Sequence, residues 1–214
     1  MKYHKIETIY ERDNITGRLI EGKYRSKEVE FLKDNIWEFT EKVDGTNVRV
    51  IWDGYRVSFG GRKENSSIPA HLLEKLNTLF GGEINEQLFE QKFGEKEVVL
   101  FGEGYGPKIQ ACGSAYVDEV DFILFDVAVN GKYLSRDNVN EVATYFNIQS
   151  VPVIFKGVLE DGIKYVKSNP TSVIAKDKTL HMEGLVARPA VELYNSNGER
   201  IIVKIKYRDF KEGV

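Results

Sequence analysis

The sequence predicts an α+β fold. Many short segments have the alternating or continuous apolar pattern of strands, and only a few carry apolar residues at helical spacing. The pairs Asp53-Gly54 and Asn130-Gly131 are strong hairpin signals between such segments. Many strands interspersed with a few helices are typical of α+β domains and argue against a doubly wound sheet.

The composition is that of a globular protein, and its charge limits how it can bind nucleic acid. The chain has 214 residues, of which 42% are hydrophobic and 29% charged, so it can bury a substantial core. Thirty basic residues against 33 acidic ones give a net charge of −3. This balance excludes a protein that coats nucleic acid through bulk charge, so a polynucleotide would have to bind a local patch.

The cysteine and apolar content indicates the cellular compartment in which the protein is expected. Cys112 is the single cysteine, which excludes a disulfide framework and a Cys-cluster zinc site and suits a reducing compartment. Three scattered histidines argue against a His-based zinc site. No run of 18 apolar residues exists, and no apolar segment follows Met1 as in a secretory signal. We expect a cytoplasmic protein with no membrane partner, or one in the infected-cell cytoplasm if its source is viral.

The first half of the chain predicts strands and then two helices. A short strand is expected over 6–10 and another over 36–39, before the hairpin at Asp53-Gly54. Residues 60–65 then leave the sheet as a loop. Large apolar residues recur at helical spacing over 72–80 and 84–93, and glycines end both runs.

The second half predicts buried strands and shorter helices. The expected elements are, in order, strands over 97–103 and 121–129, a helix with Ser135 as N-cap through Phe146, a strand over 151–155, helices over 162–167 and 171–175, and strands over 182–188 and 200–208. No internal repeat or linker interrupts them.

Lys42 is the residue around which a site can be built. It lies in the sequence Glu-Lys-Val-Asp-Gly-Thr-Asn at 41–47, between an apolar strand and the hairpin. A lysine fixed at a strand end can be held against a ligand. The commoner alternative is an ordinary exposed lysine before a turn.

Lys204 and Lys206 are predicted to share one face of the last strand. Val203, Ile205 and Tyr207 would take one face, and Lys204, Lys206 and Arg208 the other. Residues two apart on a strand lie about 6.6–7 Å apart, so the two ammonium groups can bind one phosphate. The alternative is the solvated face of an edge strand, which lysines often guard.

Two glutamates and an aromatic residue complete the candidates. Glu103 and Glu183 each lie beside a glycine at the end of an apolar strand. A carboxylate there can accept from a ribose hydroxyl or hold a hard metal ion, although a salt bridge at the sheet edge is commoner. Of Phe122 and Phe125, at least one is expected in the core, and a ring at the sheet mouth can stack on a base.

Six ordered motifs resemble those of the covalent nucleotidyltransferase superfamily, which contains polynucleotide ligases and messenger-RNA capping enzymes. Within it, the sequence is most similar to the nick-sealing RNA ligases of the RNA ligase 2 type, over nearly the whole chain. The motifs are the nucleophile motif Lys42 to Asn47, then Arg62, Gly102-Glu103 with Gly106 to Gln110, Phe125-Asp126, Glu183 to Val186, and Lys204 with Lys206. The Gly-Pro-x-Ile-Gln sequence at 106–110 is particular to RNA ligases.

The resemblance implies a fold and a reaction. The fold is a nucleotidyltransferase (ATP-grasp-like) domain of antiparallel sheets flanked by helices, with the nucleotide pocket between the sheets, and we expect a single adenylyltransferase domain over 1–214. Lys42 would attack the α-phosphorus of ATP in the presence of Mg²⁺ or Mn²⁺, expel pyrophosphate and carry AMP. RNA ends bearing a 5′-phosphate and a 3′-hydroxyl would then be joined.

The resemblance also gives each site residue a role. Attack requires a neutral amine, and Lys204, Lys206, a metal ion and burial are expected to lower the pKa of Lys42 from about 10.4. Lys204 and Lys206 would also neutralise the α-phosphate. The other assignments are Glu183 to the divalent metal, Arg62 and Glu103 to the ribose, Phe125 to stacking on adenine, the Glu41 main chain to the base edge, Asn47 to the sugar and phosphates, and Arg188 to a phosphate.

Two features depart from the RNA ligase pattern. Asp44 stands where RNA ligases of this type often carry histidine, whereas aspartate is usual in DNA ligases and capping enzymes. Only Tyr207 to Val214 follow the Lys-x-Lys motif, so we expect the usual C-terminal OB fold or helical module to be absent. A separate protein could then help to bind the RNA ends or nicked duplex, and we expect the chain to be a monomer.

Three rival functions stay open. Asp44 favours an ATP-dependent DNA ligase of the same superfamily. A capping guanylyltransferase would use GTP, and Thr46-Asn47 with Gly106 to Gln110 argue against it. The third is a non-catalytic nucleotide- or RNA-binding module derived from a ligase, which the retained charged motif residues disfavour.

Overall fold

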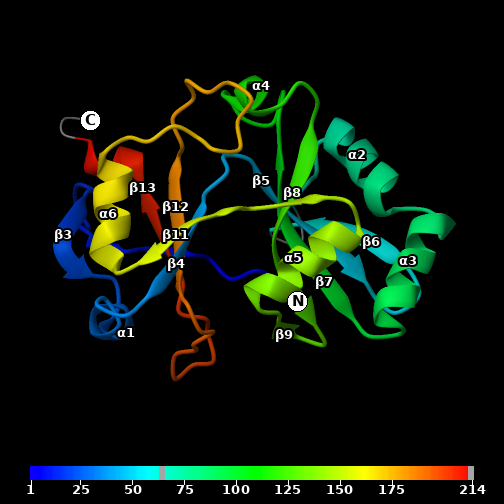
Figure 1. The fold of residues 1–214 in the computed structure, drawn as a ribbon, viewed down its shortest axis with the longest axis horizontal. Helices are drawn as coiled ribbons and strands as arrows, with labels where there is room; N and C mark the ends of the chain where they lie inside the picture. Colours follow the sequence, from blue (N-terminus) through cyan, green and yellow to red (C-terminus); the bar gives the residue numbers. More distant parts are fainter. Residues whose placement is uncertain (63–65, 212–214) are drawn as a thin grey trace. The chain divides into compact units, whose positions relative to one another are not determined.

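The computed structural model describes residues 1–62 and 66–211, which divide into two compact units (Figure 1). Unit 1 comprises Met1–Tyr3 and Asp44–Val151, and unit 2 comprises His4–Val43 and Pro152–Val214. Positions 63–65 of the expected 60–65 loop and the terminal positions 212–214 lie outside the described residues. Each unit combines a sheet with helices, so the predicted α+β class is confirmed.

Unit 1 contains a mostly antiparallel sheet with the order β10-β8-β7-β5-β6, and β9 beside β8. Its strands are β5 (Thr46–Trp52), β6 (Val57–Gly61), β7 (Val98–Tyr105), β8 (Asp121–Val129), β9 (Lys132–Tyr133) and β10 (Gln149–Ser150). Its helices are α2 (Ala70–Phe80), α3 (Glu83–Phe93), α4 (Gly113–Tyr116) and α5 (Arg136–Tyr145). The short β10–β8 ladder is parallel.

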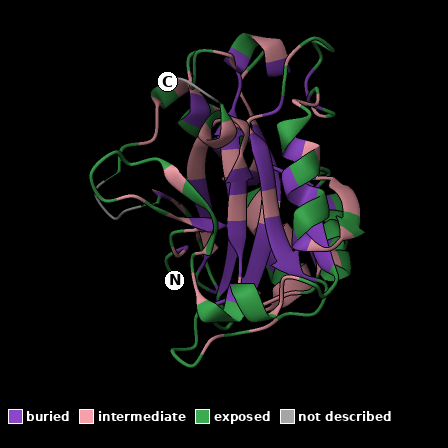
Figure 2. Ribbon diagram, turned by 90° about the vertical axis from the view of Figure 1, so that its left-hand side faces the viewer, coloured by how far each residue is buried: buried purple, intermediate pink, exposed green. Residues whose placement is uncertain are grey.

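Helices α2, α3 and α5 bury their apolar stripes against one face of this sheet. Leu76, Phe89 and Val142 from the helices pack with Val50 and Leu100 from the strands. Figure 2 shows the same pattern, with buried residues along the strands and exposed residues on the outer sides of helices. Because strand side chains alternate between faces, Asn47, Phe101 and Glu103 project from the opposite face.

Unit 2 contains a sheet with the order β1-β13-β12-β4-β11 and a β2–β3 hairpin. Its strands are β1 (Glu7–Thr8), β2 (Tyr10–Arg12), β3 (Leu19–Tyr24), β4 (Trp37–Glu41), β11 (Val153–Gly157), β12 (Gly184–Pro189) and β13 (Val203–Lys206). Its helices are α1 (Lys27–Phe31), α6 (Leu159–Lys167) and the 3₁₀ helix η1 (Tyr207–Phe210). The β1–β13 ladder is parallel and the other sheet ladders are antiparallel.

Helix α6 covers one face of the unit 2 sheet. Ile163 and Val166 pack with Phe39, Leu185 and Ile205 in the core of this unit. The helix approaches the sheet closely at Gly162, where a Cβ would collide with the ring of Phe39. A glycine at this position therefore lets α6 approach the sheet that carries the lysines.

The expected hairpins are confirmed, and local hydrogen bonds explain them. The Asp53 carboxylate accepts from the main-chain N–H groups of Tyr55 and Arg56, and Gly54 has a φ of +102°. Asn130 and Gly131 both have positive φ, as the tight turn between β8 and β9 requires. Ser135 caps α5 as predicted, since its hydroxyl accepts from the N–H of Asn138.

Three expectations at the C-terminal end need correction. The helix expected over 171–175 is absent, because N–H groups there donate to side chains: that of Val173 to Glu41 and that of Ala175 to Ser172. Helix α6 begins at Leu159, three residues before the expected start at 162. The last strand ends at Lys206 and continues as η1, so Arg208 does not share the strand face of Lys204.

The pattern of residues 1–35 predicted one strand, whereas the structure has β1, β2, β3 and α1 there. Their mixed charges lack a clear apolar period, although Ile9, Tyr10 and Val29 of this segment are buried in the core of unit 2. No helix in the described ranges is long and apolar enough to cross a membrane.

Candidate active site

The face of the unit 2 sheet opposite α6 is polar. Core side chains of β4, β12 and β13 alternate with polar ones that project from the other face. The register arranges this polar face in three rows: Lys42 with Gly184 and Lys206, Thr40 with Val186 and Lys204, and Glu38 with Arg188. Two neighbouring rows therefore hold all three lysines of the predicted site.

Glu183 joins Lys42 to Lys206 at the end of the first row. Nζ of Lys42 lies 2.5 Å from one carboxylate oxygen of Glu183, and Nζ of Lys206 lies 2.5 Å from the other. The main-chain N–H of Lys42 donates to the carbonyl of Gly184 at 2.9 Å, which holds the strand ends together. The exposed fractions of the three charged side chains are 23%, 11% and 16% for Lys42, Lys206 and Glu183.

Lys204 adds a further positive charge one row away. Burial, and then the ammonium groups of Lys206 and Lys42, lower the pKa of Lys204 to about 8. Burial opposes the shift at Glu183, but attraction to Lys42 and hydrogen bonds from both lysines leave the pKa of that carboxyl below its usual value. Two lysines that share one carboxylate, with a third lysine one row away, form a site that favours an anion such as phosphate.

The side chain of Glu41 lies on the core side of the sheet and is buried. One carboxylate oxygen accepts from the Ser172 hydroxyl at 2.5 Å, and the other accepts from the N–H of Val173 at 2.9 Å. Burial raises the pKa of Glu41, although these hydrogen bonds oppose the shift. Sequence reasoning considered only the main chain of this residue and missed that its carboxylate binds the loop before Glu183.

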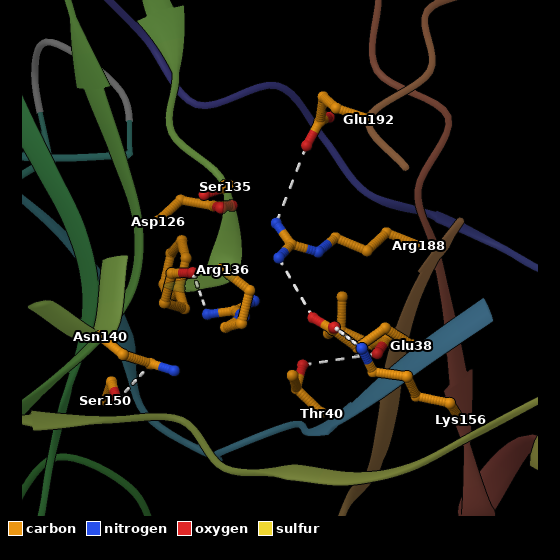
Figure 3. A network of polar contacts seen from close by, with 12 residues as sticks. Glu38, Thr40, Asp126, Ser135, Arg136, Asn140, Ser150, Lys156, Arg188 and Glu192 are labelled. Atoms are coloured by element: carbon orange, nitrogen blue, oxygen red, sulfur yellow. Dashed lines mark hydrogen bonds and ion pairs between the residues drawn. The ribbon is translucent and has the colours of Figure 1, made fainter. Parts of the chain in front are cut away.

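Arg188 lies in the third row, outside the lysine cluster. Its guanidinium contacts Glu38 at 3.1 Å and Glu192 at 3.8 Å, and Lys156 contacts Glu38 at 3.3 Å (Figure 3). Arg188 pairs in register with Glu38, four residues before Lys42, a separation of about 13 Å along the strand. Arg188 is therefore two rows from Lys42 and one row from Lys204, and its acidic partners Glu38 and Glu192 were not predicted.

In unit 1, Asn47 and Glu103 are direct neighbours in the β5–β7 register. Both project from the sheet face opposite the helices. The side-chain oxygen of Asn47 is buried and has no hydrogen-bond partner among the described residues. A buried acceptor without a donor is costly, so this oxygen is able to accept a hydrogen bond from a hydroxyl or amine.

Arg62 comes directly after the register pair Val48 and Gly61, at the end of β6. It is exposed and precedes the positions 63–65. The chain order thus puts Arg62 at the same end of β5 as Asn47.

Phe125 and Phe122 have different surroundings on β8. Phe122 is 1% exposed and packs with the helices of unit 1, so it is the core ring that the sequence required. Phe125 is half-buried and lies at a β-bulge, where Phe101 pairs with Asp126 and the next residue, Gly102, pairs with Leu124. A bulge redirects a side chain relative to the regular strand, which leaves Phe125 as the accessible ring of the pair.

Residues 110–116 hold the nucleophile motif where it enters unit 1. Gln110 donates from its side-chain amide to the carbonyl of Gly45 at 2.9 Å, and the Cys112 thiol lies 3.4 Å from a carboxylate oxygen of Asp44. The N–H of Asp44 donates to the hydroxyl of Tyr116 at 3.4 Å. Gln110 of the Gly-Pro-x-Ile-Gln sequence therefore positions the loop next to Lys42 in sequence.

Sequence comparison places this arrangement among known proteins. The chain matches the family described as RNA ligase over residues 35–206, which span every motif above. The chain belongs to the RNA ligase family.

Solved structures of an RNA ligase from Naegleria gruberi share the fold of the present chain. The structure with pyrophosphate matches with a TM-score of 0.62 and 19% identity, over 84% of this chain and 51% of that chain. A variant with ATP and manganese matches with a TM-score of 0.66 and 18% identity, over 96% of this chain and 56% of that chain. The present chain thus spans about half the length of these structures, and the likeness confirms antiparallel sheets flanked by helices.

Among the described residues of this RNA ligase family site, Glu183 is the acidic side chain that lies between the lysines and could contact a divalent metal. No group of three or more histidine, cysteine or acidic side chains is placed to hold a metal ion within residues 1–62 and 66–211. Magnesium is often held by one or two carboxylates together with substrate phosphates. The single carboxylate of Glu183, beside lysines suited to phosphate, is compatible with a metal that binds together with a nucleotide.

Proposed function

We propose that the chain is the adenylyltransferase part of an ATP-dependent RNA ligase, which forms a covalent lysyl-AMP and seals 5′-phosphate and 3′-hydroxyl RNA ends. The observation that carries this proposal is the half-buried amine of Lys42, linked through Glu183 to Lys206 and accompanied by Lys204. Membership of the RNA ligase family supports the reaction class. The related Naegleria structures with ATP and manganese support ATP and a divalent metal as cofactors.

In the first step, Nζ of Lys42 attacks the α-phosphorus of ATP. The bond from that phosphorus to the β-phosphate oxygen breaks, pyrophosphate leaves, and the amine loses a proton as the phosphoramidate forms. Before the attack, the Lys42 ammonium must leave its ion pair with Glu183 and lose one proton to solvent, since an ammonium group has no lone pair. Lys204 and Lys206 then stabilise the charge on the phosphate during transfer.

Glu183 would hold the divalent metal once Lys42 has left it. The metal supplies positive charge to the phosphates when bound. In the second and third steps AMP passes to the 5′-phosphate of one RNA end, and the 3′-hydroxyl of the other end displaces it.

We assign the remaining residues to the parts of the nucleotide. Asn47 contacts the sugar and phosphates, and its unpartnered oxygen supports a donor such as a ribose hydroxyl. Arg62 and Glu103 bind the ribose, and Phe125 stacks on adenine. The main chain of Glu41 meets the base edge.

Arg188 is assigned to a phosphate other than the one transferred by Lys42. Its register position, about 13 Å along the strand from Lys42, favours a phosphate of the RNA. We further propose that residues 1–214 act as one monomeric adenylyltransferase domain, and that a separate protein can contribute to RNA binding.

Incubation with labelled ATP or GTP and Mg²⁺, followed by intact mass measurement, tests the central step. We expect one AMP adduct on wild type and none on Lys42→Ala. Lys132→Ala is a matched control, because Lys132 is an exposed lysine on β9. A GMP adduct, or AMP on the Lys42→Ala protein, would overturn the assignment.

A DNA ligase is the second candidate, and Asp44 is the observation that favours it. Sealing assays on matched RNA and DNA nicks separate the two. We expect faster sealing of RNA nicks; faster sealing of DNA would reverse the order. An AMP adduct without sealing of either nick would support a requirement for a separate RNA-binding partner.

A further inference from the structure

Tyr3 is bound to a motif residue far away in the sequence. Its hydroxyl donates to a carboxylate oxygen of Asp126 at 2.5 Å, across 123 residues. Tyr3 is 7% exposed and Asp126 is 3% exposed. A buried carboxylate is costly unless it accepts hydrogen bonds, so this contact holds both side chains in place.

The ring of Tyr3 packs directly against Phe125. The two ring centroids lie 5.0 Å apart at an angle of 68°. Tyr3 also contacts Phe101 at 5.0 Å and Tyr133 at 6.1 Å, so its ring is held from several sides. Phe125 lies in a bulge and lacks the regular packing of Phe122, so Tyr3 limits the orientations that its ring can take.

On the basis of the proposed function, we infer that Tyr3 is a positioning residue for the nucleobase site. Asp126 fixes the Tyr3 hydroxyl, and the Tyr3 ring holds Phe125 in the orientation that stacks on adenine. Asp126 directly follows Phe125 in the motif. It supports Phe125 indirectly, through its hydrogen bond to Tyr3. Tyr3 itself does not touch the reacting atoms.

The test measures equilibrium binding in a Lys42→Ala background, where nucleotidyl transfer is blocked. ATP and inorganic tripolyphosphate are the two probes, because tripolyphosphate can contact the lysines but has no base. We expect Tyr3→Ala to weaken ATP binding about tenfold, a part of the usual energy of base stacking on an aromatic ring. Tripolyphosphate binding should be unchanged.

Two further variants separate positioning from a general loss of structure. Tyr3→Phe keeps the ring but loses the bond to Asp126, so ATP binding should weaken by about threefold. Tyr145→Phe is the matched control: it also loses one hydroxyl hydrogen bond, to the carbonyl of Leu88, and should bind ATP like the parent.

Equal weakening of ATP and tripolyphosphate binding would overturn the inference, as would parent-like ATP binding by folded Tyr3→Ala. If Tyr3→Ala does not fold, Tyr3→Phe decides, and parent-like ATP binding by that variant overturns the inference. Failure of the proposed function is distinguishable, because it appears as a wild-type protein that forms no AMP adduct. Base-selective binding in the Lys42→Ala background does not depend on that adduct.

Discussion

The carboxylate of Glu41 accepts a 2.5 Å hydrogen bond from the hydroxyl of Ser172, although 131 residues separate them. Glu41 is the last residue of β4 and directly precedes Lys42, while the loop that begins near Ser172 leads to Glu183. This contact therefore fixes the nucleophile strand to the loop that carries the acidic partner of the nucleophile.

Glu41→Gln should change how stability depends on pH. Burial raises the pKa of Glu41 above its ordinary value of 4.5. A raised acid pKa gives a stability contribution that is present below pH 4.5 and is lost as pH rises through the folded-state pKa. Glutamine does not titrate, so Glu41→Gln does not lose this contribution. Its free energy of unfolding should therefore increase relative to that of wild type as pH rises.

Urea denaturation from about pH 4 to pH 8 measures this difference. Ser172→Ala is the control, because it removes the two hydrogen bonds of the Ser172 hydroxyl, to Glu41 and from the N–H of Ala175, but keeps the titrating carboxyl. The difference in unfolding free energy between Glu41→Gln and wild type should change with pH in this direction. A constant difference, or one in which wild type becomes relatively more stable as pH rises, would contradict the burial of a titrating Glu41.

Lys204→Met should stabilise the fold while it removes nucleotidyl transfer. The pKa of Lys204 is lowered from 10.5 to about 8, so the folded state disfavours its ammonium form. This penalty is present in full below about pH 8 and fades as pH rises towards 10.5. After a discount for solvent screening of a half-exposed charge, the gain in unfolding free energy at pH 7 should be about 1 kcal/mol.

Thermal or urea denaturation gives the stability, and intact mass after incubation with ATP gives the transfer. Lys132→Met is the matched control and should change neither quantity appreciably, since Lys132 is exposed on β9. A Lys204→Met protein that is less stable than wild type at pH 7, or that still forms the adduct at the wild-type rate, would refute the assigned environment.

The strand period and the order of the motifs predicted much of the lysine cluster. Period-two spacing put Lys204 and Lys206 on one face, and the structure adds Lys42 through Glu183. The hairpin at Asp53-Gly54 and the core position of Phe122 also follow from local rules, because nearby residues determine them.

Residues that depend on long-range pairing were not predicted. Nothing in the local sequence around Tyr3 indicates a bond to Asp126, and the pairing of Glu38 with Arg188 spans 150 residues. At 171–175 the sequence predicted a helix that the structure lacks, because the Glu41 carboxylate accepts a hydrogen bond from the N–H of Val173. Tertiary hydrogen bonds decided these places, and a periodic pattern does not contain them.

Gln110→Glu should slow formation of the AMP adduct with little loss of stability. The Gln110 amide donates to the carbonyl of Gly45, whereas a carboxylate at this position would repel that oxygen. Gln110 is exposed, so we expect less than about 1 kcal/mol of destabilisation. The loop that follows Lys42 would shift, and the single-turnover rate should fall roughly tenfold, as positioning effects of this kind allow.

Gln110→Ala separates repulsion from loss of the donor and should have a smaller effect on the rate. Adduct formation at the wild-type rate in Gln110→Glu would show that the contact with Gly45 does not position the nucleophile motif.

Glu183→Gln should abolish transfer and destabilise the fold mainly above acidic pH. Glutamine keeps the shape but leaves Lys42 and Lys206 without their shared counter-ion, at a cost of roughly 3 kcal/mol, the lower end of the range for a buried pair. The lowered pKa of Glu183 means that its stability contribution is present above pH 4.5 and is lost as pH falls through the folded-state value. The gap in unfolding free energy should therefore close in acid.

Glu38→Gln is the matched control for this prediction. Glu38 is also buried on the polar face and paired with two cations, Arg188 and Lys156, but it lies four residues before Lys42. Its replacement should lower stability by a similar amount and leave the AMP adduct measurable by intact mass. Equal loss of the adduct in both variants would mean that Glu183 acts only through stability, and that the charge beside Lys42 has no separate part in transfer.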